Sequence, residues 1–72
     1  MMTELMFPFI NIIGNREITV DGFRGIEDFS ESEVTFCAGN MLICIGGSDL
    51  IIRYMSVHTI VVAGKITSIK FS

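Results

Sequence analysis

Short apolar runs rich in Ile, Val, Phe and Thr recur along the chain, and most of them end at a glycine. Runs of roughly four to eight residues with this composition are typical of β-strands. We predict seven strands from them: Met6–Ile13, Glu17–Asp21, Val34–Ala38, Met41–Ile45, Leu50–Met55, Thr59–Ala63 and Ile66–Phe71. The pattern favours an all-β domain, an antiparallel meander that folds into a small sandwich or open barrel of about seven short strands, with a short β-solenoid as the alternative.

Glycines punctuate these runs and are the predicted turn positions. Gly14, Gly39, Gly46 and Gly64 each follow an apolar run, where glycine tolerates the positive φ that tight turns require. We expect each of them to end a strand.

The clearest local prediction is a hairpin at Gly39-Asn40. A two-residue loop there places Ala38 opposite Met41 and Phe36 opposite Ile43. One face of the hairpin is then wholly apolar and belongs to the core: Val34, Phe36, Ala38, Met41, Ile43 and Ile45. Cys37 and Cys44 share the other face, but only as diagonal neighbours about 7–8 Å apart. Since a disulfide needs Cα atoms closer than this, the register argues against a bridge.

One segment carries a helix signal. Ser30-Glu31-Ser32-Glu33 fits the capping box, in which a serine is followed three residues later by glutamate. The residues that follow, Val34-Thr35-Phe36-Cys37, are poor helix formers and alternate with period two. We therefore predict a strand from Val34, with a short helix as the alternative.

Two later strands are apolar on both faces, which predicts an interface between copies. Half of the 72 residues are hydrophobic, and a core in so short a chain supplies little stability on its own. A strand covered on both sides lacks the alternation of apolar and polar residues, and Leu50–Met55 and Thr59–Ala63 lack it. We expect a homodimer or larger assembly, with these candidate self-association residues: Ile51, Tyr54, Met55, Val61 and Ala63.

Composition and charge narrow the class of protein. Five basic against eight acidic residues give a net charge of -3, which disfavours nucleic-acid binding. The longest uncharged stretch, residues 34–48, is shorter than a membrane span. No basic residue precedes Arg16, so a signal peptide is not expected, and two cysteines are too few for a disulfide scaffold. We expect one β domain over residues 1–72 in the cytoplasm.

No motif in the sequence indicates a catalytic reaction. His58 is the single histidine, and CxxC, P-loop and GxGxxG motifs are absent from the sequence. The acidic stretch from Glu27 to Glu33 lacks calcium-loop spacing and is interpreted as a solvated loop. We therefore predict no catalytic residues, metal or cofactor. Arg16, Glu17, Arg24 and Glu33 are instead candidate contacts to a partner protein, since arginine is enriched at interfaces.

The order of several motifs resembles the YabP/YqfC family of sporulation proteins, over residues 8–71. The resemblance is carried by these blocks: Pro8 and Ile10 with Ile12-Ile13-Gly14-Asn15-Arg16-Glu17-Ile18, Arg24-Gly25-Ile26, Phe29-Ser30-Glu31-Ser32-Glu33-Val34, Leu42 to Ile52, and Gly64-Lys65-Ile66-Thr67-Ser68-Ile69-Lys70-Phe71. The chain departs from the family where Gly22-Phe23 replaces a polar pair before Arg24.

The resemblance implies a part in endospore formation in Firmicutes, within the mother-cell programme, and no enzymatic activity. Some members are paired with a membrane protein, so a membrane-bound sporulation partner is expected. The implied location is the mother-cell cytoplasm, including the periphery of the forespore membrane or the spore coat.

We therefore expect a non-enzymatic structural or adaptor protein that self-assembles and docks a partner. One alternative is a small ligand-binding or catalytic β-barrel with Arg16, Glu17, Arg24 and His58 around a cleft, which requires those groups to converge. The other is a structural protein of a phage or mobile element.

Overall fold

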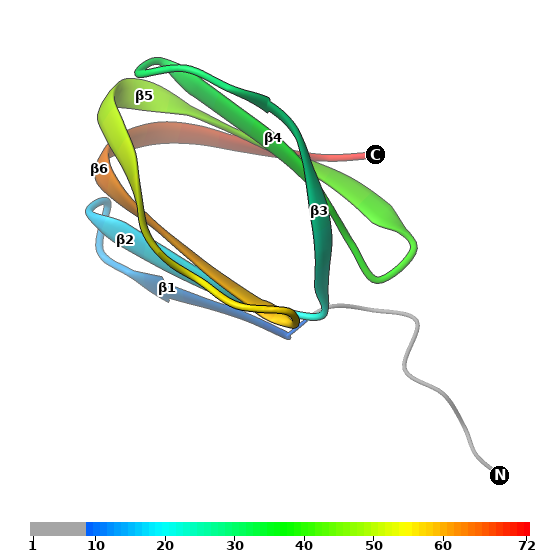
Figure 1. The fold of residues 1–72 in the computed structure, drawn as a ribbon. Helices are drawn as coiled ribbons and strands as arrows, with labels where there is room; N and C mark the ends of the chain where they lie inside the picture. Colours follow the sequence, from blue (N-terminus) through cyan, green and yellow to red (C-terminus); the bar gives the residue numbers. More distant parts are fainter. Residues whose placement is uncertain (1–8) are drawn as a thin grey trace, which may run out of the picture.

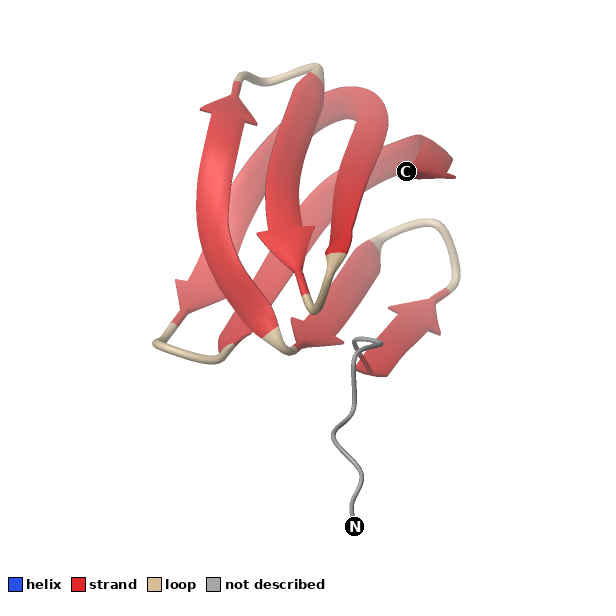
Figure 2. Ribbon diagram, turned by 90° about the vertical axis from the view of Figure 1, so that its right-hand side faces the viewer, coloured by secondary structure: helices blue, strands red, loops and turns tan. Residues whose placement is uncertain are grey.

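The described residues of the protein, 9–72 in a computed structural model, form strands joined by short turns (Figure 2). The strands are β1 (Phe9–Ile13), β2 (Glu17–Asp21), β3 (Phe23–Phe29), β4 (Glu33–Ala38), β5 (Met41–Met55) and β6 (Thr59–Phe71). Residues 6–8 of the first predicted strand lie outside the described part of the chain.

The six strands make one open antiparallel sheet in the order β1-β2-β6-β5-β4-β3. The sheet folds over on itself, so that two layers face each other (Figure 1). The first layer holds β1, β2, residues 59–63 of β6 and residues 51–55 of β5. The second holds β3, β4, residues 41–46 of β5 and residues 66–71 of β6. The all-β sandwich or open barrel is thereby confirmed, whereas the β-solenoid would need parallel strands.

The two long strands correct the predicted strand count. Met41–Ile45 and Leu50–Met55 were predicted as separate strands but are parts of β5, and Thr59–Ala63 and Ile66–Phe71 are parts of β6. Gly14 and Gly39 lie in turns, but Gly46 and Gly64 lie inside these strands, so their assignment as turn glycines was wrong. Both glycines stand at bends, where the strand passes from one layer to the other.

β3 is the strand that the sequence pattern missed. Its polar residues Arg24, Glu27 and Asp28 interrupt the apolar alternation. Its pairing with β4 contains two register shifts, which put extra residues into the strand. An edge strand of this kind carries no clear period of two and is hard to recognise from sequence alone.

The bends are held together by close backbone contacts. A Cβ added at Gly64 would stand 2.6 Å from the Asp49 carbonyl oxygen, and the φ of 138° at Gly64 favours glycine in any case. The backbone N–H of Gly64 donates to the Arg16 carbonyl at 3.0 Å, and that of Leu50 donates to the Glu31 carbonyl at 2.9 Å. Each hairpin turn therefore ties one long strand at its bend.

The predicted hairpin has the expected register. Ala38 pairs with Met41, Phe36 with Ile43, and Thr35 with Cys44. The face predicted as core is buried except for the half-buried Met41. Both cysteines are free thiols, in agreement with the register argument.

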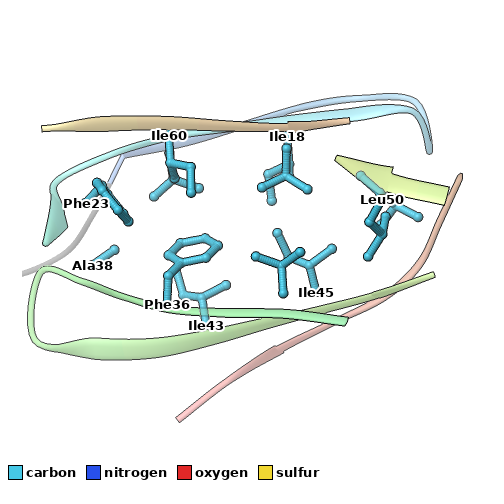
Figure 3. Packing of buried hydrophobic residues seen from close by; sticks show 12 residues of the cluster. Ile18, Phe23, Phe36, Ala38, Ile43, Ile45, Leu50 and Ile60 are labelled. Carbon is cyan, nitrogen blue, oxygen red and sulfur yellow. The ribbon is translucent and has the colours of Figure 1, made fainter. Parts of the chain in front are cut away.

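The core fills the space between the two layers (Figure 3). Ile18 and Ile60 point from the first layer toward Phe36, Ile43 and Ile45 of the second. The ring of Phe36 packs edge-on against Phe23, with centroids 6.0 Å apart. The largest fully buried side chains are Phe36, Ile18, Ile43, Ile45, Leu50, Ile60, Val20, Val34 and Val62.

The capping-box serine stabilises a turn instead of a helix. The Ser30 hydroxyl oxygen accepts from the backbone N–H of Glu33 at 3.1 Å and from that of Ser32 at 3.3 Å. Because β4 begins at Glu33 and pairs with β5, the chain continues as a strand. The same local chemistry that caps helices here closes the β3–β4 turn.

Candidate functional site

The outer face of the first layer carries exposed apolar side chains. Alternation along β6 puts Val62 in the core and turns Val61 and Ala63 outward. Their partners across the sheet are Tyr54 and Ile51, which are 56% and 54% exposed. We call Ile51, Tyr54, Val61 and Ala63 the outer patch. No described strand covers it.

The outer patch contains four of the five predicted self-association residues. Val61 is half-buried and Ala63 is nearly covered by its neighbours, so Ile51 and Tyr54 supply most of the accessible surface. The fifth residue, Met55, pairs with the buried Ile60 at the end of β5, and its side chain is 52% exposed. Strict alternation along the strand would put Ile51 on the same face as Met55 and opposite Tyr54. The register shift between Ile52 and Tyr54 instead brings Tyr54 to the outer face and turns Met55 away from it.

A charged hollow of about 660 Å³ adjoins the outer patch at the bend of the sheet. It lies between the β1–β2 turn and the two long strands, and it is lined by Ile13, Asn15, Arg16, Glu17, Asp49, Arg53, Gly64 and Lys65. Three of the five basic residues of the chain line it. Arg16 and Glu17 were predicted as partner contacts, whereas Asp49, Arg53 and Lys65 are brought there by the bends of β5 and β6.

The charges in this hollow are accessible to another molecule. The Arg53 Nη1 atom lies 3.9 Å from the Glu17 Oε1 atom, and the Arg53 side chain is 64% exposed. An exposed pair at that distance contributes about 1 kcal/mol at most. Arg53 and Glu17 can therefore separate and pair with groups on a second protein at little cost in free energy.

Arg24 lies in a second hollow, of about 520 Å³, beside the β4–β5 turn. Its Nη1 atom donates to the Gly39 carbonyl at 3.2 Å. The Cys37 thiol lines the same hollow and lies 3.5 Å from the Glu27 carboxylate, as a hydrogen-bond donor. Burial raises the pKa of Cys37, the hydrogen bond and charge of Glu27 raise it further, and the charge of Arg24 lowers it.

Glu33 lines neither of the two hollows. Its Oε2 atom accepts from the Cys44 thiol at 2.9 Å on the outer face of the second layer. The four residues predicted as partner contacts thus divide among three sites, and Arg16 and Glu17 alone share one. Their proximity follows from adjacency in the sequence, while the grouping of the other charges follows from the fold.

The cleft required by the ligand-binding alternative is not formed by its named residues. His58 is exposed in the β5–β6 turn, and its carbonyl accepts from the backbone N–H of Gly22 at 2.8 Å. This contact lies just beyond the end of β2, whereas Arg16 precedes its start. Arg24 lines a different hollow from Arg16 and Glu17.

Two further features of the described residues concern metals and membranes. Within residues 9–72, no three His, Cys, Asp or Glu side chains gather in a way that could hold a metal ion. None of these residues belongs to a helix that could span a bilayer.

In a comparison with known families, the model of the YabP family matches residues 8–72. Comparisons with curated proteins and with solved structures gave no match. The family match covers nearly the whole chain and includes the outer patch and both hollows.

Proposed function

The chain belongs to the YabP family, and from this membership we propose that it is a non-enzymatic structural or adaptor protein of endospore formation. It acts by self-assembly and by docking a partner protein. The family is a sporulation family, which supports the coarse assignment to sporulation. The structural and adaptor role rests on the surface described above.

The outer patch is the single observation that carries the proposal. Ile51 and Tyr54 are large apolar side chains that are about half exposed, and a register shift between Ile52 and Tyr54 puts both on the outer face of the sheet. Apolar side chains grouped in this way mark contact surfaces on small proteins. Tyrosine in particular is enriched where proteins bind one another. The patch is suited to contact with a second copy of the chain.

The charged hollow supplies a surface for the other partner. Arg16, Arg53 and Lys65 are directed to one place beside the patch, with Glu17 and Asp49 among them. Mixed charges at the edge of an apolar patch give the polar rim that interfaces require. We propose that this rim contacts a membrane-bound sporulation protein, from the mother-cell side of the forespore membrane or within the coat.

The role is tested by deleting the gene in its host and counting heat-resistant spores. The count should fall and should return when the wild-type gene is restored. A normal count in a strain that has no second family member would contradict the sporulation role.

The contribution of the patch is tested in the same strain. A Tyr54→Glu gene should fail to restore spores, because a buried carboxylate at an interface is costly. Leu42→Glu is the matched control: Leu42 is also partly exposed, but it pairs with Cys37 in the second layer. If Tyr54→Glu restores the spore count, or if both variants fail to restore it, the outer patch has no specific part in sporulation.

A further inference from the structure

The folded sheet leaves several strand edges without a partner among the described residues. β1 and β3 are the ends of the strand order. In addition, β6 pairs with β2 only over residues 59–63, and β5 pairs with β4 only over residues 41–46. An unpaired edge presents a row of N–H and C=O groups that can bind another strand, and proteins usually protect such edges.

Three of these edges, those of β3, β6 and β5, carry features that disfavour the addition of a strand. β3 has two register shifts and the charged residues Arg24, Glu27 and Asp28. The free part of β6 carries Lys65 and Lys70. Charges and bulges of these kinds disfavour the addition of a strand.

The free part of β5 is protected as well. It carries Arg53, and the charged residue Asp49 at its start has a φ of 54°, which interrupts regular strand geometry. A strand added there would meet both a charge and a distorted backbone.

β1 has none of this protection. Its register with β2 runs from Phe9↔Asp21 to Ile13↔Glu17 without a shift, and it contains no charged residue. Ile12 and Ile13 on this strand are 49% and 54% exposed. The edge of β1 is thus regular, uncharged and flanked by apolar side chains.

The sequence of β1 is complementary to itself. When two copies run antiparallel about a two-fold axis at Asn11, Ile10 of one copy lies opposite Ile12 of the other, and the two Asn11 residues face each other. Ile10 and Ile12 lie opposite Val20 and Ile18, so they point to the core side, and Asn11 points outward with Thr19. Isoleucine meets isoleucine on the core side and amide meets amide on the outer side.

We propose that β1 pairs antiparallel with β1 of a second copy, about a two-fold axis at Asn11, and joins the two sheets edge to edge. The interface is isologous, so it closes at two copies. The inference goes beyond the proposed function, because it concerns an edge outside the outer patch and does not depend on a role in sporulation.

The pairing would shape the surface offered to a partner. In the dimer, the outer face of the first layer of one copy continues into that of the other copy. One outer patch then lies on each side of the two-fold axis. A partner that carries two binding segments would then gain affinity from their linkage. Self-association through the outer patch would add further copies to this dimer.

The test is the mass of the full-length chain by light scattering over a dilution series. In a Tyr54→Glu background, which prevents association through the outer patch, the protein should have twice the chain mass. Asn11→Lys and Asn11→Asp in that background should each fall to the chain mass, because like charges would lie opposite each other across the axis. An equimolar mixture of the two variants should return to twice the chain mass, because lysine then faces aspartate.

Control variants separate this edge from other surfaces. Asn40→Lys places the same charge on another exposed asparagine, in the β4–β5 turn, and Ile26→Lys places it on the β3 edge. In the Tyr54→Glu background, both should keep twice the chain mass. Asn11→Cys in a Cys37→Ser, Cys44→Ser background should form an interchain disulfide, whereas Asn40→Cys should not.

Three results would overturn the pairing. They are a monomeric wild type at the highest soluble concentration, an unchanged mass in both Asn11 variants, or a mixture of these variants that stays monomeric. A normal spore count in the deletion strain would reject the proposed function. If the purified protein still formed the β1 dimer, this inference would stand.

Discussion

A Cβ atom on Gly47 of β5 would overlap the carbonyl oxygen of Lys65 in β6. The two backbones touch where both long strands bend, next to the shift in their register at Gly46/Gly47. The contact holds the bends of these two neighbouring strands against each other, and Lys65 of this contact lines the charged hollow. The bend and the hollow therefore depend on the absence of a side chain at residue 47.

Gly47→Ala should lower the free energy of unfolding by about 1–3 kcal/mol, the usual cost of forcing an extra carbon into a filled space. Urea unfolding followed by circular dichroism measures the change. Gly25→Ala is the matched control, because a Cβ at Gly25 meets nothing within 4 Å. Equal losses in the two variants would show that the close approach does not matter.

Ile60→Val should lower the free energy of unfolding by about 0.5–1.5 kcal/mol, since it leaves a methyl-sized space in the core. Ile51→Val makes the same change on the exposed outer patch and should stay within about 0.5 kcal/mol of wild type. The comparison is made by urea unfolding at a concentration low enough that the chains are monomeric. A larger loss at Ile51 than at Ile60 would contradict the placement of Ile60 in the core and of Ile51 on the surface.

Ser30→Ala should lower the free energy of unfolding by about 0.5–1.5 kcal/mol, because the N–H groups of Ser32 and Glu33 lose their acceptor. Thermal unfolding provides the measurement. Ser48→Ala serves as the control, since Ser48 is exposed and its hydroxyl makes no hydrogen bond within residues 9–72. A stability equal to that of wild type would indicate that water replaces the hydroxyl without loss.

Cys37 should react slowly with iodoacetamide near pH 8, because its raised pKa leaves little thiolate. Glu27→Gln should speed the reaction, since it removes the charge that disfavours the thiolate. Arg24→Gln should slow it, since the cation that favours the thiolate is lost. Rates are measured by mass spectrometry in a Cys44→Ser background, and changes of the opposite sign would refute the assigned causes.

The β4–β5 hairpin and its core face were predictable because their determinants are local. Gly39-Asn40 sets the loop, and the loop sets the register from Ala38↔Met41 outward. Alternation then assigns Phe36 and Ile43 to the core without any distant contact. The same logic located Ile51 and Val61 on a second apolar face, and the ordered motifs of the family were readable along the chain.

The ends and bends of the long strands were not predictable in this way. Gly46 and Gly64 have the local features of turn residues, and a glycine permits a turn or a bend equally well. The choice is made by packing: the bend of β5 lies against the bend of β6, and hydrogen bonds from the two hairpin turns hold both in place. β3 was missed for a related reason, because its place in the sheet depends on pairing with β4.

The amino-acid sequence by itself determined the class of fold, the hairpin, the core face and the family, because each depends on local periodicity or on the order of short motifs. Tertiary structure alone decided that Arg53 and Lys65 join Arg16 at one hollow, and that Met55 is separate from the outer patch. Those relations arise from register shifts and from the folding of one sheet into two layers. Both depend on contacts between residues far apart in the chain, which no local pattern encodes.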